Sequence, residues 1–221
     1  ARPLAPEELE GVPTIELLNE LKRRHQLLGR PPARVAVLGP PCAGKRTQAE
    51  ALRRGFGVCR ISAKDLSGDS HSAGPSDERA ATALASLLER PQCRRGFVLE
   101  GFPGTVAQAQ RVQEVLEDRG SPLQAAIFLD APEEALAERC RGRLFHAPSG
   151  RLYHDRFKPP AEEGMDDFTG EALTRPPHDS AAFRRELEAY RERAGLLREF
   201  FGRKSLARDV DAGGGAEEVS A

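Results

Sequence analysis

The chain has 221 residues, 30% of them charged, and a formal net charge of -1 at pH 7. This length suits one domain with room for a small inserted lobe. The near-neutral charge argues against general attraction to nucleic acid, and no apolar run reaches the length of a membrane span.

The first 33 residues are predicted to form an arm and a helix. Residues 1–12 are acidic and rich in proline, which predicts an extended arm. From Thr14, which can cap a helix, to residue 28, apolar residues recur at helical spacing with basic residues on another side. The arm, this helix and the C-terminal tail at 212–221 are candidate docking elements for protein partners in a larger assembly, and the alternative is that these terminal segments are simply solvated.

A strand, a glycine-bearing turn and a helix follow in the order typical of a P-loop. They are predicted at 34–38, 39–47 and 48–54. The backbone N–H groups of such a turn, with the helix N-terminus behind it, cradle phosphate oxygens. Lys45 would place its charge at the β- and γ-phosphates, and Thr47 its hydroxyl near Mg²⁺. Because Arg46 stands where the general motif has Ser or Thr, an ordinary turn with a surface lysine is the alternative.

Apolar strands then alternate with helices. The strands are predicted at 58–61, 97–99 and 123–129, and the helices at 77–89, at 105–117 and from Pro132 onward. This alternation predicts an α/β fold, a parallel sheet with helices on both faces. Ligands bind beyond the carboxyl ends of strands in such sheets, where the P-loop and Glu100 both lie.

The alternation ends at residues 144–178, which are rich in Pro, Gly, His and charge and predict a small inserted lobe. A long amphipathic helix is expected at 180–201, and a run of glycines predicts a flexible tail at 212–221. The core would therefore consist of residues 34–143 and 179–211.

The four cysteines, at 42, 59, 93 and 140, contain no Cys-x-x-Cys pair, which argues against a zinc site or a redox motif. A reducing, intracellular compartment is the default expectation. The cytoplasm and an organelle such as a mitochondrion, plastid or cilium are not distinguished. The chain begins at Ala1 without Met, which leaves open a targeting segment before it.

Four motifs follow one another along the chain: the P-loop at 39–48, Ile61-Ser62-Ala63-Lys64-Asp65, Glu100-Gly101-Phe102-Pro103-Gly104-Thr105 with Gln108, and the lid stretch 138–174. In these motifs and in their order, the chain resembles the adenylate kinase family, in its long-lid plant and protist type. The resemblance covers residues 34–211, and the helix before them resembles a plant-type N-terminal extension. It implies a P-loop three-layer α/β/α fold with a parallel sheet, a lid at 144–178 and a truncated arm for the nucleoside monophosphate at 66–75.

The resemblance implies a largely retained ATP half. The family transfers the γ-phosphoryl group of Mg-ATP to AMP by positioning phosphates and neutralising their charge. The implied ATP-binding residues are Gly39, Gly44, Lys45, Arg46, Thr47 and Arg139. If the chain is active, the implied catalytic residues are Lys45, Arg139 and Arg143. Mg²⁺ would arrive with ATP and be held by Glu100 through water, with no direct protein ligand.

The lid carries four residues that match a hydrogen-bonded quartet of family members without zinc. They are His146, Ser149, Asp166 and Thr169. The quartet would hold the lid as four cysteines around zinc do elsewhere, so zinc is not expected. Isolated polar residues in a loop are the alternative reading.

The acceptor half departs from the family pattern. Gly68 and Gly104 stand where the family has arginines that grip the AMP phosphate, and the segment 66–75 is shorter than the family's AMP-binding arm. Gln108, which reads adenine in the family, remains. Two further catalytic arginines are not aligned, although Arg175 and Arg185 each lie one place off the expected positions.

Cys42 replaces a glycine of the family's P-loop. At a helix N-terminus beside Lys45, its thiol pKa would fall and the residue would become oxidisable. The alternative is a small residue tolerated in the turn.

These observations predict an adenylate-kinase-like nucleotide-binding protein with a damaged AMP site, weak or inactive in catalysis and serving as a structural or regulatory subunit. ATP is the expected ligand, and AMP binding is expected to be weak or absent. The alternative is an active nucleoside monophosphate kinase that uses Arg60 or Lys64, or a partner's residues, for the lost arginines. An unrelated P-loop ATPase or small-molecule kinase would not explain the lid match.

Overall fold

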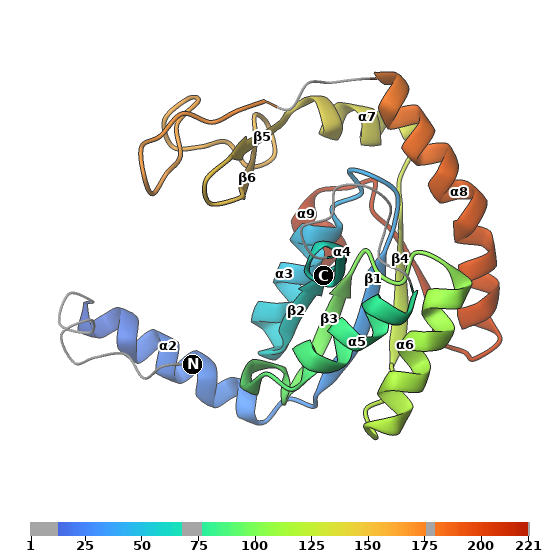
Figure 1. Cartoon of the computed structure of the whole chain (residues 1–221). Helices are drawn as coiled ribbons and strands as arrows, with labels where there is room; N and C mark the ends of the chain where they lie inside the picture. Colours follow the sequence, from blue (N-terminus) through green and yellow to red (C-terminus); the bar gives the residue numbers. More distant parts are fainter. Residues whose placement is uncertain (1–12, 68–76, 176–179, 221) are drawn as a thin grey trace. The chain divides into compact units, whose positions relative to one another are not determined.

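A computed structural model describes residues 13–67, 77–175 and 180–220 of the chain (Figure 1). In the described residues, five strands belong to one mostly parallel sheet in the order β2-β3-β1-β4-β7, and helices flank it, which confirms the predicted α/β fold. The chain divides into two compact units. The first comprises Ala1–Val37 and Ala49–Ala125, and the second comprises Leu38–Gln48 and Ala126–Ala221.

The first unit carries the strands β2, β3 and most of β1. Its elements are α2 (Thr14–Leu28), β1 (Ala33–Leu38), the greater part of α3 (Lys45–Phe56), β2 (Cys59–Ser62), α4 (Ala63–Ser67), α5 (Asp77–Leu88), a short 3-10 helix (Pro91–Cys93), β3 (Gly96–Glu100) and α6 (Val106–Asp118). Strand β3 pairs in parallel with β1 and with β2. Its central residues Val98 and Leu99 are fully buried, because a middle strand is covered on both faces.

Helices α5 and α6 pack against each other in this unit. Thr105 caps α6, because its side chain accepts a hydrogen bond from the backbone N–H of Gln108. The buried positions Ala109, Val112 and Leu116 recur at helical spacing along α6, as the apolar pattern predicted.

The second unit contains the P-loop and the C-terminal half of the chain. Its elements are β4 (Ala125–Asp130), α7 (Glu133–Arg141), β5 (Arg143–His146), β6 (Arg151–His154), α8 (Ser180–Gly202), β7 (Ala207–Asp211) and α9 (Ala216–Ser220). Strands β4 and β7 pair in parallel, and β5 and β6 form an antiparallel hairpin. Phe201 of α8 meets Phe128 of β4 edge to face, with ring centroids 6.4 Å apart, and both rings are fully buried.

The C-terminal segment differs from the predicted flexible tail, because α9 forms at Ala216–Ser220. The glycines before it are held by neighbouring carboxylates. The N–H of Gly213 donates to Asp211 Oδ1 (2.8 Å), and that of Gly215 donates to Glu218 Oε2 (2.8 Å). The prediction of a flexible tail rested on the entropy that glycine residues lose when their backbone becomes ordered. These side-chain contacts offset that loss.

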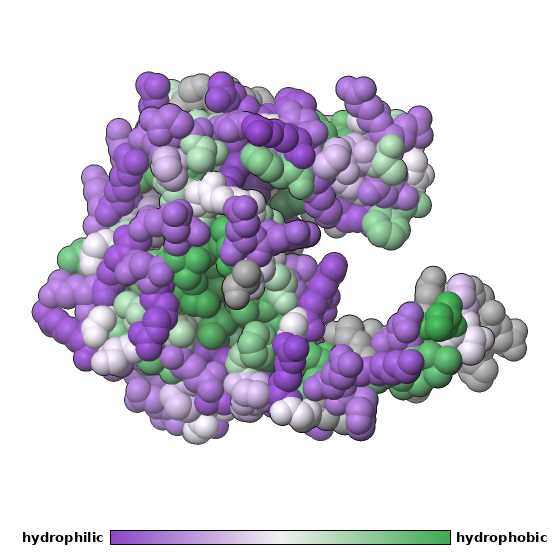
Figure 2. Space-filling view, turned by 180° about the vertical axis from the view of Figure 1, so that it is seen from behind, coloured by the Kyte–Doolittle hydropathy of each residue, from purple (hydrophilic) through white to green (hydrophobic). Residues whose placement is uncertain are grey.

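Helix α2, predicted at residues 14–28, forms at those residues and exposes apolar side chains. Ile15, Leu18 and Leu21 are 61%, 47% and 62% exposed. Figure 2 shows green, apolar surface on this helix. Among the described residues, no helix combines the length and apolarity needed to cross a membrane.

A disulfide joins Cys59, the first residue of β2, to Cys93 of the 3-10 helix. Both residues are buried. This pairing corrects the expectation that the cysteines are reduced, as in a reducing compartment. The two positions are 34 residues apart in sequence, but the pairing of β2 with β3 brings their Cα atoms to 4.8 Å. Cys42 and Cys140 are not in disulfides.

Reduction of the Cys59–Cys93 disulfide is expected to lower the free energy of unfolding by about 3 kcal/mol, because opening this loop increases the entropy of the unfolded chain. Urea unfolding with and without dithiothreitol measures the difference. The control is the double variant C59A/C93A, whose unfolding should not respond to the reductant. Equal midpoints for the native chain in both buffers would contradict the pairing.

Candidate functional site

The P-loop connects β1 to α3 and lies in the second unit. A Cβ atom at Gly39 would lie 3.0 Å from the carbonyl oxygen of Leu129, so close packing against β4 favours glycine there. Gly44 has a φ of +87°, a backbone conformation that L-residues rarely adopt. A Cβ atom at Gly44 would meet nothing within 4 Å. The two glycines therefore give a tight turn that leaves open space beside Gly44, as a phosphate cradle requires.

Lys45, the first residue of α3, folds over this loop. Its Nζ donates to the carbonyl oxygens of Gly39 (2.8 Å) and Pro40 (2.6 Å). Arg46 and Thr47 follow in the first turn of the helix and are exposed. The structure thus brings the lysine onto the loop and leaves Thr47 exposed beside it.

Cys42 occupies a strained position in the loop, with a φ of +61°. Burial, followed by a hydrogen bond with the Cys140 side chain, raises the pKa of its thiol to about 12. The charges of Arg143 and Lys45 act in the opposite direction and are outweighed. The hypothesis of a low-pKa, oxidisable thiol is therefore wrong, because burial has a larger effect than the neighbouring positive charges.

Arg139, near the end of α7, contacts the C-terminal segment. Its Nη2 donates to the carbonyl oxygens of Gly213 (3.1 Å) and Gly214 (2.8 Å). Gln48 of α3 is buried and donates its Nε2 to the Ala216 carbonyl oxygen at 3.0 Å. These contacts attach residues 213–216 to the elements that carry the expected ATP-binding side chains. Sequence reasoning missed them, since it treated this segment as a tail.

The lid residues form a hydrogen-bonded network. His146 Nδ1 lies 2.7 Å from Ser149 Oγ and 3.8 Å from Asp166 Oδ1, and Thr169 Oγ1 donates to Asp166 Oδ2 at 3.0 Å. His146 and Asp166 are buried. The structure therefore brings together the four polar residues that the lid motif singled out.

The network also contains three residues beyond that quartet. Arg151 donates to both carboxylate oxygens of Asp166, from Nε (2.7 Å) and from Nη2 (2.6 Å). The Tyr153 hydroxyl donates to Asp166 Oδ1 at 3.0 Å, and Glu171 Oε2 lies 2.6 Å from His146 Nε2. The Arg151 guanidinium holds the pKa of Asp166 well below its usual range. All three residues lie within the lid motif, but their pairing required the fold.

Gln108, the predicted acceptor residue, and Glu100, predicted to hold Mg²⁺ through water, both lie in the first unit. Glu100, the last residue of β3, forms an ion pair with Arg60 of β2. Gln108 Oε1 accepts from the backbone N–H of Gly104 at 2.9 Å, so its amide folds back onto its own loop. Gly68 lies outside the described residues. Arg175, a candidate catalytic arginine, donates to the Arg141 carbonyl oxygen at 2.6 Å.

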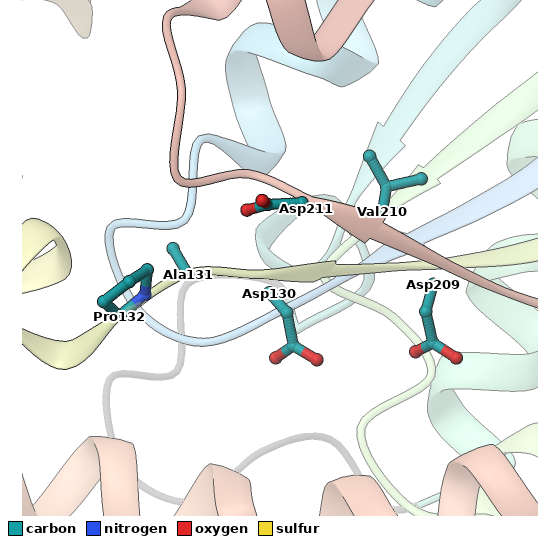
Figure 3. Close-up of a pocket in the computed structure, with 6 residues that line it drawn as sticks. All are labelled: Asp130, Ala131, Pro132, Asp209, Val210 and Asp211. Atoms are coloured by element: carbon teal, nitrogen blue, oxygen red, sulfur yellow. The ribbon is translucent and has the colours of Figure 1, made fainter.

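A pocket of about 360 Å³ lies at the carboxyl ends of β4 and β7 (Figure 3). Asp130, Asp209 and Asp211 line it, and Figure 3 shows Asp130 and Asp209 pointing to the same side. Arg198 donates to Asp130 Oδ2 (2.5 Å) and to Asp209 Oδ1 (2.8 Å). The acidic lining does not suit a polyphosphate. Among the described residues, no group of three or more His, Cys, Asp or Glu could hold a metal ion.

The relatives that comparison with known proteins finds for this chain are adenylate kinases. A family model described as "Adenylate kinase, active site lid" matches residues 143–176. Adenylate kinase 4 of Oryza sativa subsp. japonica is 32% identical over 234 residues, covering 98% of this chain and 96% of the relative. Adenylate kinase 4 of Arabidopsis thaliana is 30% identical over 98% and 95% of the two chains. An adenylate kinase of the yeast Vanderwaltozyma polyspora is 35% identical over 84% of this chain and 92% of its own.

Substitution of Asp166 by Asn is expected to destabilise residues 143–175, because it removes the carboxylate that Arg151 and Tyr153 hold. Faster hydrogen exchange of this segment would show the loss. The matched control is R156Q, which breaks an exposed ion pair with Glu138 and should leave exchange unchanged.

The same carboxylate predicts a dependence on pH. Because the folded-state pKa of Asp166 is lowered, its stabilisation is present above the unfolded-state pKa of about 4 and is lost as pH falls further. The exchange difference between native chain and D166N should therefore shrink below pH 4. A difference independent of pH would contradict the charge-based account.

Proposed function

The chain belongs to the adenylate kinase family, and on that premise we propose that it binds Mg-ATP through its P-loop unit and phosphorylates AMP weakly or not at all. The observation that carries this proposal is an asymmetry. The expected ATP-binding residues are present in the second unit, whereas the acceptor residues of the first unit include Gly104 in place of an arginine.

The ATP half contains three cations of the kind that phosphoryl transfer uses. The chemistry consists mostly of positioning phosphates and neutralising their negative charge. Lys45 lies on the loop that would receive the phosphates, and Arg139 and Arg143 lie at the end of α7 and the start of β5. We propose these three residues as the cationic groups of the ATP site, with Gly39 and Gly44 shaping the backbone.

Mg²⁺ would enter this site with ATP. The Thr47 hydroxyl and the Glu100 carboxylate are oxygen donors of the kind that Mg²⁺ and its bound waters prefer. The ion would supply positive charge to the β- and γ-phosphate oxygens. Thr47 and Glu100 would act by orienting that ion or its waters.

The acceptor half lacks charges that its relatives would supply to AMP. Gly104 cannot contact a phosphate through a side chain, and Gly68 has the same defect. Loss of one such donor typically costs about 3 kcal/mol of transition-state stabilisation, which is more than a hundredfold in rate. This chain lacks the arginines at both positions. It is therefore better suited to bind ATP within an assembly, as a structural or regulatory subunit, than to phosphorylate AMP rapidly.

A second candidate function is an active nucleoside monophosphate kinase with a rebuilt acceptor site. Arg60 favours it, since this arginine lies on β2 within reach of Glu100 at the end of β3. An arginine there could replace part of the lost positive charge.

Substitution of Lys45 by Ala is expected to weaken binding of a non-hydrolysable ATP analogue with Mg²⁺ at least tenfold, because the phosphates lose a cation. Calorimetry measures the affinity. The control is K204A, an exposed lysine beyond α8 that should leave binding unchanged. Failure of the native chain to bind the analogue would refute the proposal. ADP formation from Mg-ATP and AMP at ordinary kinase rates of about 1–100 s⁻¹, lost in K45A, would instead select the second candidate.

Substitution of Gly104 by Arg is expected to raise ADP formation from Mg-ATP and AMP by about tenfold or more, because it restores a phosphate contact. A Cβ atom there would lie 3.5 Å from Gln108 Oε1, an ordinary contact. The control is G195R on α8, where a Cβ meets nothing within 4 Å. An unchanged rate for G104R would show that the weakness of the acceptor half does not arise at this position.

A further inference from the structure

Arg60 is an arginine of the first unit that the expected ATP chemistry does not use. Arg60 lies on β2, a four-residue strand that pairs with β3 (Figure 1). In the register of the two strands, Arg60 lies opposite Val98. Two positions further along, Ser62 lies opposite Glu100. Because side chains alternate along a strand, Arg60 shares the face of Glu100 and reaches along the sheet to its carboxylate.

The ion pair joins Arg60 Nη1 to Glu100 Oε2 and is largely withdrawn from solvent. The two side chains are 24% and 16% exposed. Removing an arginine from water carries a cost that the carboxylate offsets only in part, so such a pair is weak evidence for a stabilising role alone. Glu100, to which Arg60 reaches, is the last residue of β3 and lies at the carboxyl edge of parallel strands, where such sheets bind ligands, which favours a role in binding.

A guanidinium group can serve two anions at once. It has five N–H donors in one plane, and among the contacts of the described residues Arg60 uses Nη1 alone. Glu100 would therefore hold one edge of the group and leave other donors to phosphate oxygens. Arginine is suited to this task because its planar fork matches the geometry of phosphate.

The backbone around Arg60 is unusually well held. The residue before it, Cys59, forms the disulfide with Cys93. Strand β2, which carries Cys59 and Arg60, pairs with β3. Lys64 of α4 is the other described cation between residues 59 and 67, and it is exposed. An anchored arginine loses less freedom on binding than an exposed lysine on a flexible stem.

We propose that Arg60 binds the phosphate of the acceptor, a nucleoside monophosphate, and that the residual acceptor affinity of this chain depends on it. The proposal rests on the proposed function, since it assigns the acceptor contact of that reaction. Glu100 acts as the positioning residue for the guanidinium. One arginine in place of two accounts for an acceptor site that is weak rather than absent.

Calorimetric titration of the full chain with AMP, in the absence of ATP, tests this assignment. R60Q should weaken AMP binding at least tenfold, as expected for loss of a charged hydrogen-bonding partner. R60K should bind with an intermediate affinity. The matched control is R119Q, because Arg119 is 31% exposed and also pairs with a glutamate, Glu89; its AMP affinity should stay within about twofold of the native value.

R60Q leaves Glu100 without its partner, so a second variant guards against misfolding. The double variant R60Q/E100Q removes both charges, and it should lose AMP binding as R60Q does while unfolding near the native temperature. Binding of an ATP analogue without Mg²⁺, measured on the same samples, should be unchanged in R60Q and R60K.

AMP binding that is unchanged in R60Q, or undetectable in the native chain at millimolar AMP, would overturn the assignment. Equal weakening of AMP and ATP-analogue binding in R60Q and in R60K would assign Arg60 a purely structural role and also overturn it. Failure of the proposed function would give a different result, because in that case the native chain would not bind the ATP analogue.

Discussion

Parallel pairing of β3 with β1 and with β2 is the constraint on which the first unit depends. It buries Val98 and Leu99 in the middle strand and brings the carboxyl ends of the neighbouring strands to one edge. Arg60 and Glu100 meet because of this register, although 40 residues separate them in sequence. A shift of one residue in β2 would turn Arg60 to the opposite face of the sheet.

Charge compensation shapes the second unit in a comparable way. Asp166 is buried as an anion because Arg151 and Tyr153 satisfy its oxygens. A buried carboxylate without such partners would be costly, so the network specifies one arrangement of the segment. Hydrogen bonds and charge thus organise this lid, and the described part of the chain holds no cluster of metal-binding residues there.

In the P-loop, the side chain of Cys42 is placed for packing, and its thiol is not reactive. Cys42 adopts a left-handed backbone conformation and meets Cys140 of α7, and its thiol is protonated at neutral pH because burial raises its pKa to about 12. The loop around it keeps the glycines at 39 and 44 and the lysine at 45.

Local pattern in the sequence determined much of this protein. The apolar strands, the capped helix α6, the glycine-bearing loop and the lid motif depend on neighbouring residues, so the α/β fold and the family could be predicted from them. Only the tertiary structure decided which distant groups meet: Cys59 with Cys93, Arg60 with Glu100, Arg139 with the carbonyl oxygens of 213 and 214, and Cys42 with Cys140. These contacts follow from strand register and from burial, which depend on the packing of the whole chain and leave no signal in a short stretch of sequence.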